Sequence, residues 1–320
     1  MKFTDISHST PAYLVLGVGI LAVSSASILI RISQQEATSL VIAAYRLTIA
    51  SLVLLPITVS RNGIELRSLK GKQLARLIAA GGFLALHFAT WITSLEWTTV
   101  ASSVVLVSTT PLWVALASPI FLKEKISRGV WLGLGLSLLG SLVVGLSSNC
   151  SIEAGRLTCD LGVHFWSGRS LLGNTLALIG GMCAAGYLVI GRQARPSLSL
   201  PVYIFCVYGA AALGLLAIAL VSGANFIGFN SGNGFQFFSL PVWLCLIGLA
   251  LGPQLLGHSA YNWALRYLPA ASVSVALLGE PIGTTILAFF LLRETPSWIE
   301  LAGGALILAG IFITSRASPE

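Results

Sequence analysis

Polar side chains recur at helical spacing in two segments that otherwise carry almost no charge. Gln254, His258 and Asn262 follow one another at intervals of four residues, which places them on one face of a helix. His87 and Trp91 have the same spacing in an earlier segment. Amide, imidazole and indole groups hydrogen-bond polar molecules, and an imidazole can carry a proton near neutral pH. These residue types predict a binding site for a small polar organic molecule, although each histidine alone could instead only join two helices.

Several aromatic rings lie in the same kind of segment and could stack on the apolar part of such a molecule. They are Trp91, Trp113, Tyr187, Tyr261 and Trp263. Together with the polar groups, we expect them to line one central cavity.

Two ionisable side chains, Arg46 and Glu280, lie in the middle of long apolar segments. A charge is expensive in such surroundings, so each one needs a partner or a functional role. The two could interact with each other across the centre of the protein, or both could face a cavity that contains water. As a structural pair they would fix helix register, and removing one partner would cost about 3–5 kcal/mol. As cavity groups they would handle substrate or a coupling proton, and the sequence leaves both interpretations open.

The segments that hold these residues are too apolar for a soluble protein. Of the 320 residues, 56% are hydrophobic and 9% are charged, whereas an ordinary soluble domain has about 25% charged residues. Several charge-free stretches reach the ~20 residues that a helix needs to cross a bilayer. We therefore predict an all-α integral membrane protein with ten transmembrane helices. Their approximate ranges are 12–31, 38–59, 74–95, 98–122, 129–148, 171–191, 200–222, 240–265, 269–292 and 298–315.

The net charge of +7 is distributed as membrane topology requires. If the amino terminus is inside, the inner segments contain thirteen Lys and Arg residues and the outer segments contain four. This asymmetry obeys the positive-inside rule and predicts that both termini are cytoplasmic, in a membrane that is most simply a bacterial inner or plasma membrane. The basic balance is thus a topology signal and gives no reason to expect nucleic acid as a partner.

A shift of 170 residues superimposes two passages of the chain. The matched pairs are Trp91 with Tyr261, Pro111 with Pro281, Glu124 with Glu294, Gly133 with Gly303 and Gly140 with Gly310. With five spans in each half, the second half begins on the opposite side of the membrane, so the repeats are inverted. We expect a first repeat at 1–148, an external loop at 149–170 and a second repeat at 171–320. The halves differ at Arg46 and at Thr110, which stands opposite Glu280.

The repeated passages carry a resemblance to a known family. The segment from Ala276 to Glu294, with Glu280-Pro281 inside it, and its counterpart from Ser108 to Lys125 resemble the drug/metabolite transporter superfamily. Within that superfamily the chain is similar to the EamA-type permeases over nearly its whole length. The resemblance implies ten helices, a central substrate cavity shared by the two halves, and alternating access. It does not imply a particular substrate, because family members move many metabolites.

Glu124 and Glu294 each lie just beyond a predicted span and beside a basic residue. They are either charges that fix the end of a helix or parts of a gate. The glycines Gly133, Gly140, Gly303 and Gly310 would let helix backbones approach closely, either within one chain or between two copies. We therefore expect a monomer or a homodimer.

Cys150 and Cys159 share the predicted external loop. An oxidising outer compartment would permit a disulfide between them. The sequence leaves open whether the bond forms, and in either case it would only join the ends of a loop.

The sequence favours a secondary transporter over other membrane proteins. It has no phosphate-binding Gly-Lys-Ser/Thr loop, no zinc-ligand spacing and no nucleophile elbow, so we expect no cofactor, no metal and no enzymatic activity, with an intramembrane enzyme or a channel as rivals. The expected partners are a small-molecule substrate, the lipid bilayer and a coupling proton if transport is coupled. Export of an amino acid or related metabolite is the first choice, and import of a nucleoside, sugar derivative or organic cation is the alternative.

Overall fold

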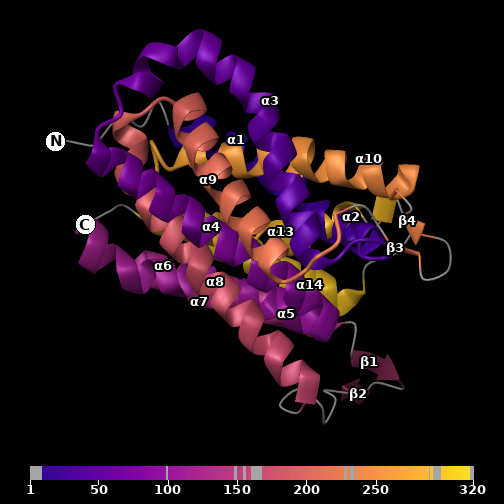
Figure 1. The fold of residues 1–320 in the computed structure, drawn as a ribbon. Helices are drawn as coiled ribbons and strands as arrows, with labels where there is room; N and C mark the ends of the chain where they lie inside the picture. Colours follow the sequence, from indigo (N-terminus) through magenta and orange to yellow (C-terminus); the bar gives the residue numbers. More distant parts are fainter. Residues whose placement is uncertain are drawn as a thin grey trace.

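The computed structural model describes residues 9–98, 100–147, 150–153, 156–159, 168–226, 229–230, 234–235, 237–287, 289–290 and 297–317. Almost all of this described chain is helical, and the helices pack side by side (Figure 1). The prediction of an all-α membrane protein is confirmed, apart from two short β-hairpins in loops.

In the described part of the first half, the structure has eight helical segments. They are α1 (Ser9–Ser24), α2 (Ala26–Ser33), α3 (Ser39–Arg67), α4 (Gly71–Trp97), α5 (Val100–Val107), α6 (Thr110–Ala117), the π-helix η2 (Ser118–Leu122) and α7 (Arg128–Ser147). A hairpin of β1 (Cys150–Glu153) and β2 (Arg156–Cys159) follows.

The second half begins with α8 (Gly168–Ala194), the 3-10 helix η3 (Arg195–Ser197) and α9 (Leu200–Val221). A second hairpin, β3 (Phe229–Asn230) with β4 (Gly234–Phe235), precedes the remaining helices. These are α10 (Leu240–Leu249), the π-helix η4 (Ala250–His258), α11 (Ser259–Ala264), α12 (Ala270–Leu277), α13 (Glu280–Leu287) and α14 (Trp298–Arg316).

Each of the ten predicted spans coincides with an apolar helical stretch. In the described part of the chain, eight stretches are long and apolar enough to cross a membrane. The stretches Arg128–Val144 and Leu301–Arg316 are apolar but shorter. The total of ten crossings therefore stays a prediction for these last two helices.

Four of the predicted spans are interrupted rather than continuous. The fourth is divided between α5 and α6 at Ser108–Thr109, and the ninth between α12 and α13 at Leu278–Gly279. The following Pro111 and Pro281 have no backbone N–H with which to continue the helix. In the fourth span the Thr110 hydroxyl donates a hydrogen bond of 2.8 Å to the carbonyl of Val107. The bounds of α12 and α13 lie 170 residues after those of α5 and α6, so the shift seen in the sequence recurs in the helices.

The first and eighth spans are interrupted as well, and the second is longer than predicted. The first is divided at Ser25 between α1 and α2, and the eighth contains the π-helix η4, which includes Pro253. The predicted second span ended near residue 59, whereas α3 continues to Arg67 and leaves helical geometry at Asn62.

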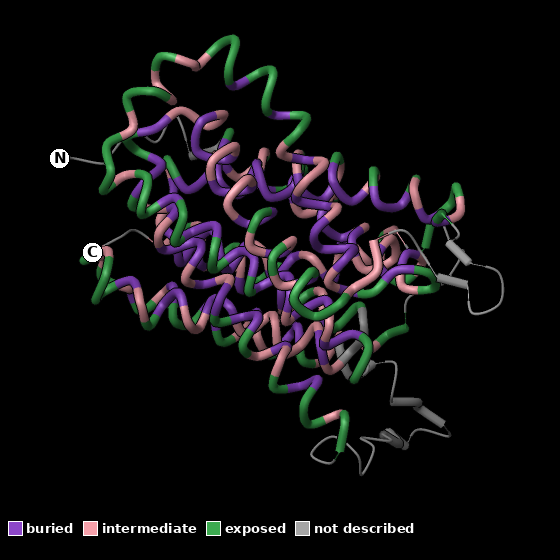
Figure 2. Tube along the Cα trace, in the orientation of Figure 1, coloured by how far each residue is buried: buried purple, intermediate pink, exposed green. Residues whose placement is uncertain are grey.

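The two halves of the chain interlock. Helix α4 packs on α8 and α9, α3 packs on α9, and α1 packs on η4. Buried residues follow the faces along which these helices meet, while the outer faces are exposed (Figure 2). The exposed positions include large apolar side chains such as Leu14 and Leu213, as expected of surfaces that contact lipid.

Glycines bring α7 and α14 into close contact. A Cβ added at Gly133 would lie 2.5 Å from the carbonyl oxygen of Gly310, and one added at Gly140 would lie 2.6 Å from that of Gly303. These four glycines therefore face each other within one chain.

Substitution of Gly140 by Ala is expected to destabilise the protein by about 1–3 kcal/mol, because the methyl group would collide with the backbone of α14. The matched control is Gly135→Ala on the same helix, where nothing lies within 4 Å of the added carbon. Thermal unfolding of the purified protein in detergent measures both. Equal melting temperatures for the two variants would contradict this packing.

Candidate functional site

A small cavity lies between the two halves of the chain. Its volume is about 70 Å³, room for a few water molecules at most. The fourth and ninth spans contribute to it at their interruptions, together with α1, α4, α8, η4 and α11. The polar and aromatic residues that line it are His87, Trp91, Ser108, Thr110, Tyr187, His258, Tyr261, Ser274 and Glu280.

Glu280 stands at the first position of α13, where the ninth span is interrupted. Its carboxylate accepts a hydrogen bond of 3.2 Å from the hydroxyl of Tyr261. Its backbone carbonyl accepts another of 3.0 Å from the hydroxyl of Ser24, so the residue is held by α11 and α1. An anion held in this way can bind a cationic group in the cavity.

The two histidines approach the cavity from different halves of the chain. His87 donates from Nδ1 to the carbonyl of Gly180 at 2.9 Å, which leaves Nε2 of the neutral ring as an acceptor. Its ring also stacks on Trp91, with centroids 5.7 Å apart. His258 lies against Phe88 and Tyr261, at 5.3 and 5.5 Å between centroids. Both histidines therefore contact other helices and also line the cavity.

Arg46 is fully buried, but the structure brings it to Gln254 rather than to Glu280. Its Nε donates a hydrogen bond of 2.8 Å to Oε1 of Gln254, and its guanidinium lies 4.3 Å from the ring centroid of Phe88. The side chains of Arg46 and Glu280, both in the described part of the chain, form no ion pair. The ion pair between Arg46 and Glu280, which was one of the two interpretations of the sequence, is therefore not formed. Arg46 is left as a buried cation without a paired anion, which costs several kcal/mol.

The predicted polar face of the eighth span is divided between separate environments. His258 reaches the cavity, Gln254 holds Arg46, and the amide of Asn262 donates 3.3 Å to the hydroxyl of Tyr208. The assumption of regular α-helical spacing is wrong here, because residues 250–258 form a π-helix with a wider turn. Pro253 cannot donate to the ladder and favours this departure.

Arg195 also differs from the expectation, since it was counted among the cations of an inner segment. Its side chain is 1% exposed and donates 2.8 Å from Nε to the carbonyl of Asn262. It therefore joins the end of α8 to α11 inside the protein. Its position directly after the sixth predicted span gave no sign of this contact.

Besides Gln254 and Asn262, the predicted site residues Trp113 and Trp263 do not line the cavity, and one predicted residue is outside the described chain. Trp113 donates from its indole to the hydroxyl of Thr109 at 3.1 Å. Trp263 packs on Tyr267, with centroids 4.7 Å apart. Glu294 lies outside the described residues.

Ser108 and Ser274 line the cavity although the sequence did not single them out. Ser108 lies in the turn between α5 and α6, just before Pro111, so the proline interruption was the signal that could have identified it. Ser274 lies inside α12 without any such signal.

Glu124 joins the two halves of the chain at one end of the molecule. Its carboxylate forms an ion pair with Nε of Arg192 at 2.7 Å. Arg192 also donates 2.9 Å from Nη1 to the carbonyl of Leu265, beside the end of α11. We call this set of contacts the Glu124–Arg192 clasp. Lys123 before it has a positive φ of 57°, which ends η2 in a tight turn.

The loop between the two halves contains the β1–β2 hairpin. Cys150 and Cys159 are opposite each other in its antiparallel register. Their backbones thus pair directly, and the disulfide between their side chains stays a prediction.

Interlocked apolar helices around an internal cavity are typical of a multi-pass membrane protein. The family model for the EamA-like transporter family matches residues 10–146 and 171–316. The chain therefore belongs to the EamA-like transporter family, and its resemblance to the EamA-type permeases is confirmed.

Curated relatives agree with this class. An uncharacterized transporter of Archaeoglobus fulgidus is 24% identical over 308 residues, which is 96% of this chain and 98% of the relative. The uncharacterized transporter YdfC of Bacillus subtilis is 25% identical over 276 residues, which is 85% of this chain and 80% of the relative. A solved structure, titled only as a crystal structure of a protein, has a TM-score of 0.72 at 18% identity, with 95% and 96% of the two chains covered. This last likeness concerns the fold.

Proposed function

We propose that this protein is a secondary transporter that moves a small polar organic metabolite across the membrane by alternating access. The observation that carries the proposal is the cavity at the interruptions of the fourth and ninth spans, where Glu280, Tyr261 and both histidines converge from the two halves. Interrupted helices that meet near the centre of inverted repeats are a common way to build a substrate site in transporters. The chain lacks a nucleotide-binding loop, so movement is facilitated or coupled to an ion.

The size of the cavity supports a change of conformation during transport. Small-molecule sites have volumes of roughly 300–1,000 Å³, whereas this cavity has about 70 Å³. The helices must therefore separate for substrate to enter. Because the Glu124–Arg192 clasp joins the two halves at one end, we propose that it closes that side of the pathway.

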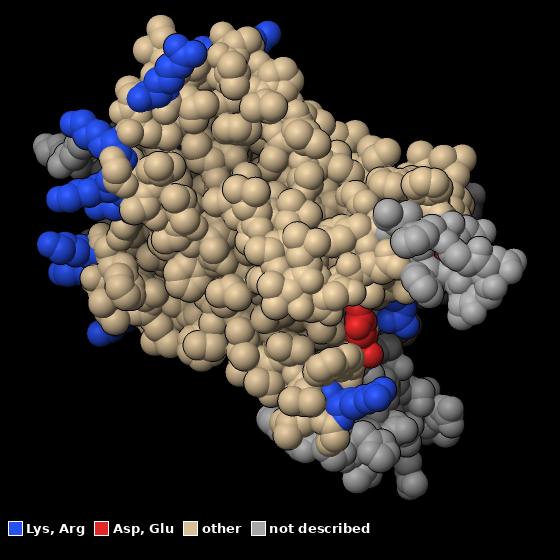
Figure 3. Space-filling view, viewed as in Figure 1, with Lys and Arg blue, Asp and Glu red and all other residues tan. Residues whose placement is uncertain are grey.

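The clasp belongs on the cytoplasmic side in this proposal. Basic side chains gather along the edge where α3 leads into α4, and charged residues of both signs lie at the opposite edge (Figure 3). The positive-inside rule assigns the first edge to the cytoplasm. Export of an amino acid or related metabolite is the direction and substrate class that we favour.

Substitution of Glu280 by Gln is expected to lower transport at least about tenfold, because a neutral amide holds a cationic substrate group far less well. Folding should survive, since the amide oxygen can still accept from Tyr261. The measurement is counterflow of a radiolabelled amino-acid mixture into proteoliposomes. Glu36→Gln is the matched control, because Glu36 accepts a backbone hydrogen bond from Ser239 far from the cavity. Unchanged counterflow by folded Glu280→Gln would contradict the proposed role.

Substitution of Glu124 by Gln is expected to favour the conformation that is open on the clasp side. A partly exposed ion pair is worth about 0.5–1 kcal/mol, so the open population should rise about two- to fivefold. The open population is measured with Ser108→Cys in a cysteine-free background. The rate at which this cysteine reacts with a membrane-impermeant maleimide in inverted vesicles rises with that population. Arg192→Lys, which keeps the charge, should react nearly as slowly as the parent. A maleimide reaction rate in Glu124→Gln that is equal to or slower than that of the parent would contradict the proposed gate.

A further inference from the structure

The guanidinium of Arg46 has unused hydrogen-bonding groups inside the protein. The side chain is 0% exposed, and only Nε has a hydrogen-bond partner, while Nη1 and Nη2 have none. These two nitrogens form the planar fork that binds a carboxylate through two parallel hydrogen bonds. Because Gln254 holds Nε, the fork is fixed in orientation.

Other buried groups without a hydrogen-bond partner, on residues that hold Arg46 or line the cavity, include further donors. Nε2 of Gln254 and Nε1 of Trp91 can only donate, and neither has a partner. Nδ1 of His258 has no partner and can donate or accept. A buried set dominated by donors is complementary to an anion or another strong acceptor.

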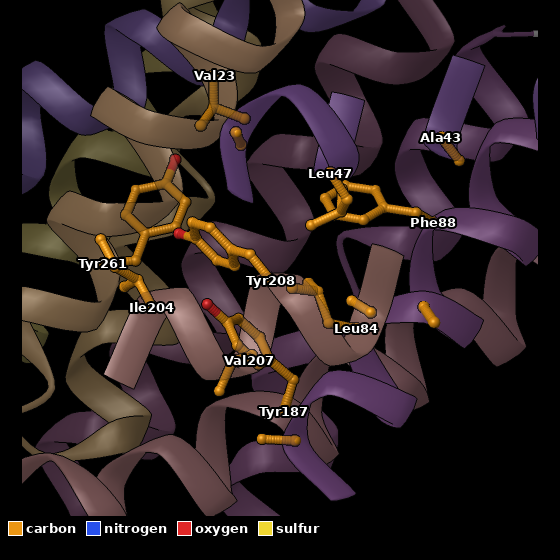
Figure 4. Close-up of a cluster of buried hydrophobic side chains, with 14 of the residues drawn as sticks. Val23, Ala43, Leu47, Leu84, Phe88, Tyr187, Ile204, Val207, Tyr208 and Tyr261 are labelled. Carbon is orange, nitrogen blue, oxygen red and sulfur yellow. The ribbon is translucent and has the colours of Figure 1, made fainter. Parts of the chain in front are cut away.

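Phe88 lies between Arg46 and His258, which lines the cavity. Its ring lies under the Arg46 guanidinium at 4.3 Å and against the ring of His258, which lines the cavity, at 5.3 Å. In Figure 4, Phe88 and Leu47 lie on one side of the buried cluster, and the rings of Tyr187, Tyr208 and Tyr261 lie on the other. A change in the Phe88 side chain would therefore open a path between Arg46 and the cavity.

The helix that carries Gln254 and His258 is suited to such a change. Residues 250–258 form a π-helix, a rare form that is frequently found at functional sites. A return of this segment toward α-helical geometry would move Gln254 and His258 relative to Arg46. The segment also packs against α1 and α3, the helices that carry Ser24 and Arg46.

We infer that Arg46 is the carboxylate-binding half of a bipolar substrate site whose amine-binding half is Glu280, with Phe88 between them until substrate enters. The substrate class is then a small zwitterion with an amino and a carboxyl group. The carboxylate of such a molecule would pair with Arg46, and its ammonium group would pair with Glu280. Each buried side chain would then have a partner of opposite charge. This inference rests on the proposed transport function and specifies its substrate.

The test compares matched ligands on purified protein. The probes are the twenty L-amino acids, followed by the amide and the decarboxylated amine of each one that raises the melting temperature. At least one acid is expected to bind about tenfold or more tightly than its amide, because only the acid presents a charged acceptor pair. In Arg46→Gln this preference should fall to about one, and Arg46→Lys should keep only part of it.

Gln254→Glu keeps the test decisive if Arg46→Gln fails to fold. The new carboxylate would pair with Arg46 inside the protein, so the melting temperature without ligand should rise while the preference for the acid disappears. Arg195→Gln is the matched control, because it removes the other buried guanidinium, whose Nε and Nη1 bond to backbone carbonyls. It should lower the melting temperature and leave the preference intact.

Three results would overturn the inference. They are equal binding of acid, amide and amine by the parent protein, an unchanged preference in Arg46→Gln and Gln254→Glu, and no stabilisation by any of the twenty acids. Counterflow separates this failure from failure of the proposed function. Flux of amines, sugars or nucleosides without a preference for acids would overturn the inference alone, whereas binding of acids without any flux would overturn the transport function alone.

Discussion

The low dielectric of the membrane interior is the constraint on which the rest of this structure depends. A polar group there must find a partner within the protein, in water or in a ligand. Most of the buried groups do so locally, as Arg195 does with the carbonyl of Asn262 and His87 with that of Gly180. Arg46 and Glu280 are different. The Arg46 side chain donates one hydrogen bond to Gln254, and the Glu280 carboxylate accepts one from Tyr261. Both partners are neutral, and no ion pair joins Arg46 to Glu280.

The interruptions in the helices follow from the same constraint. An interrupted helix leaves backbone groups without their usual partners, which is tolerated only where the helix is buried in protein or lines a watered cavity. The interruptions before Pro111 and Pro281 lie at the central cavity, and side-chain hydroxyls satisfy the backbone there, as Thr110 does for Val107 and Ser24 for Glu280. The regular helices, by contrast, provide rigid contacts, of which the glycine faces of α7 and α14 are the closest.

The apolar runs and the 170-residue shift were enough to predict the fold class, the family and the places of the helices. The polar, aromatic and ionisable residues singled out in the apolar segments include six that line the cavity: His87, Trp91, Tyr187, His258, Tyr261 and Glu280. The pairing of Arg46 with Gln254 could not be predicted, because it depends on a π-helix that assumed α-helical spacing cannot represent. The burial of Arg195 could not be predicted either. A charged residue at the end of a span is expected to contact water unless its tertiary contacts are known.

The central claim is that substrate binds in the cavity between the two halves. The most direct measurement is an experimental structure of the protein with a stabilising amino acid bound. The account predicts that the ligand occupies a widened cavity, with its amine at Glu280, its carboxylate at Arg46 and the Phe88 ring displaced from between them. A ligand bound outside this cavity, or one that contacts neither Glu280 nor Arg46, would contradict it.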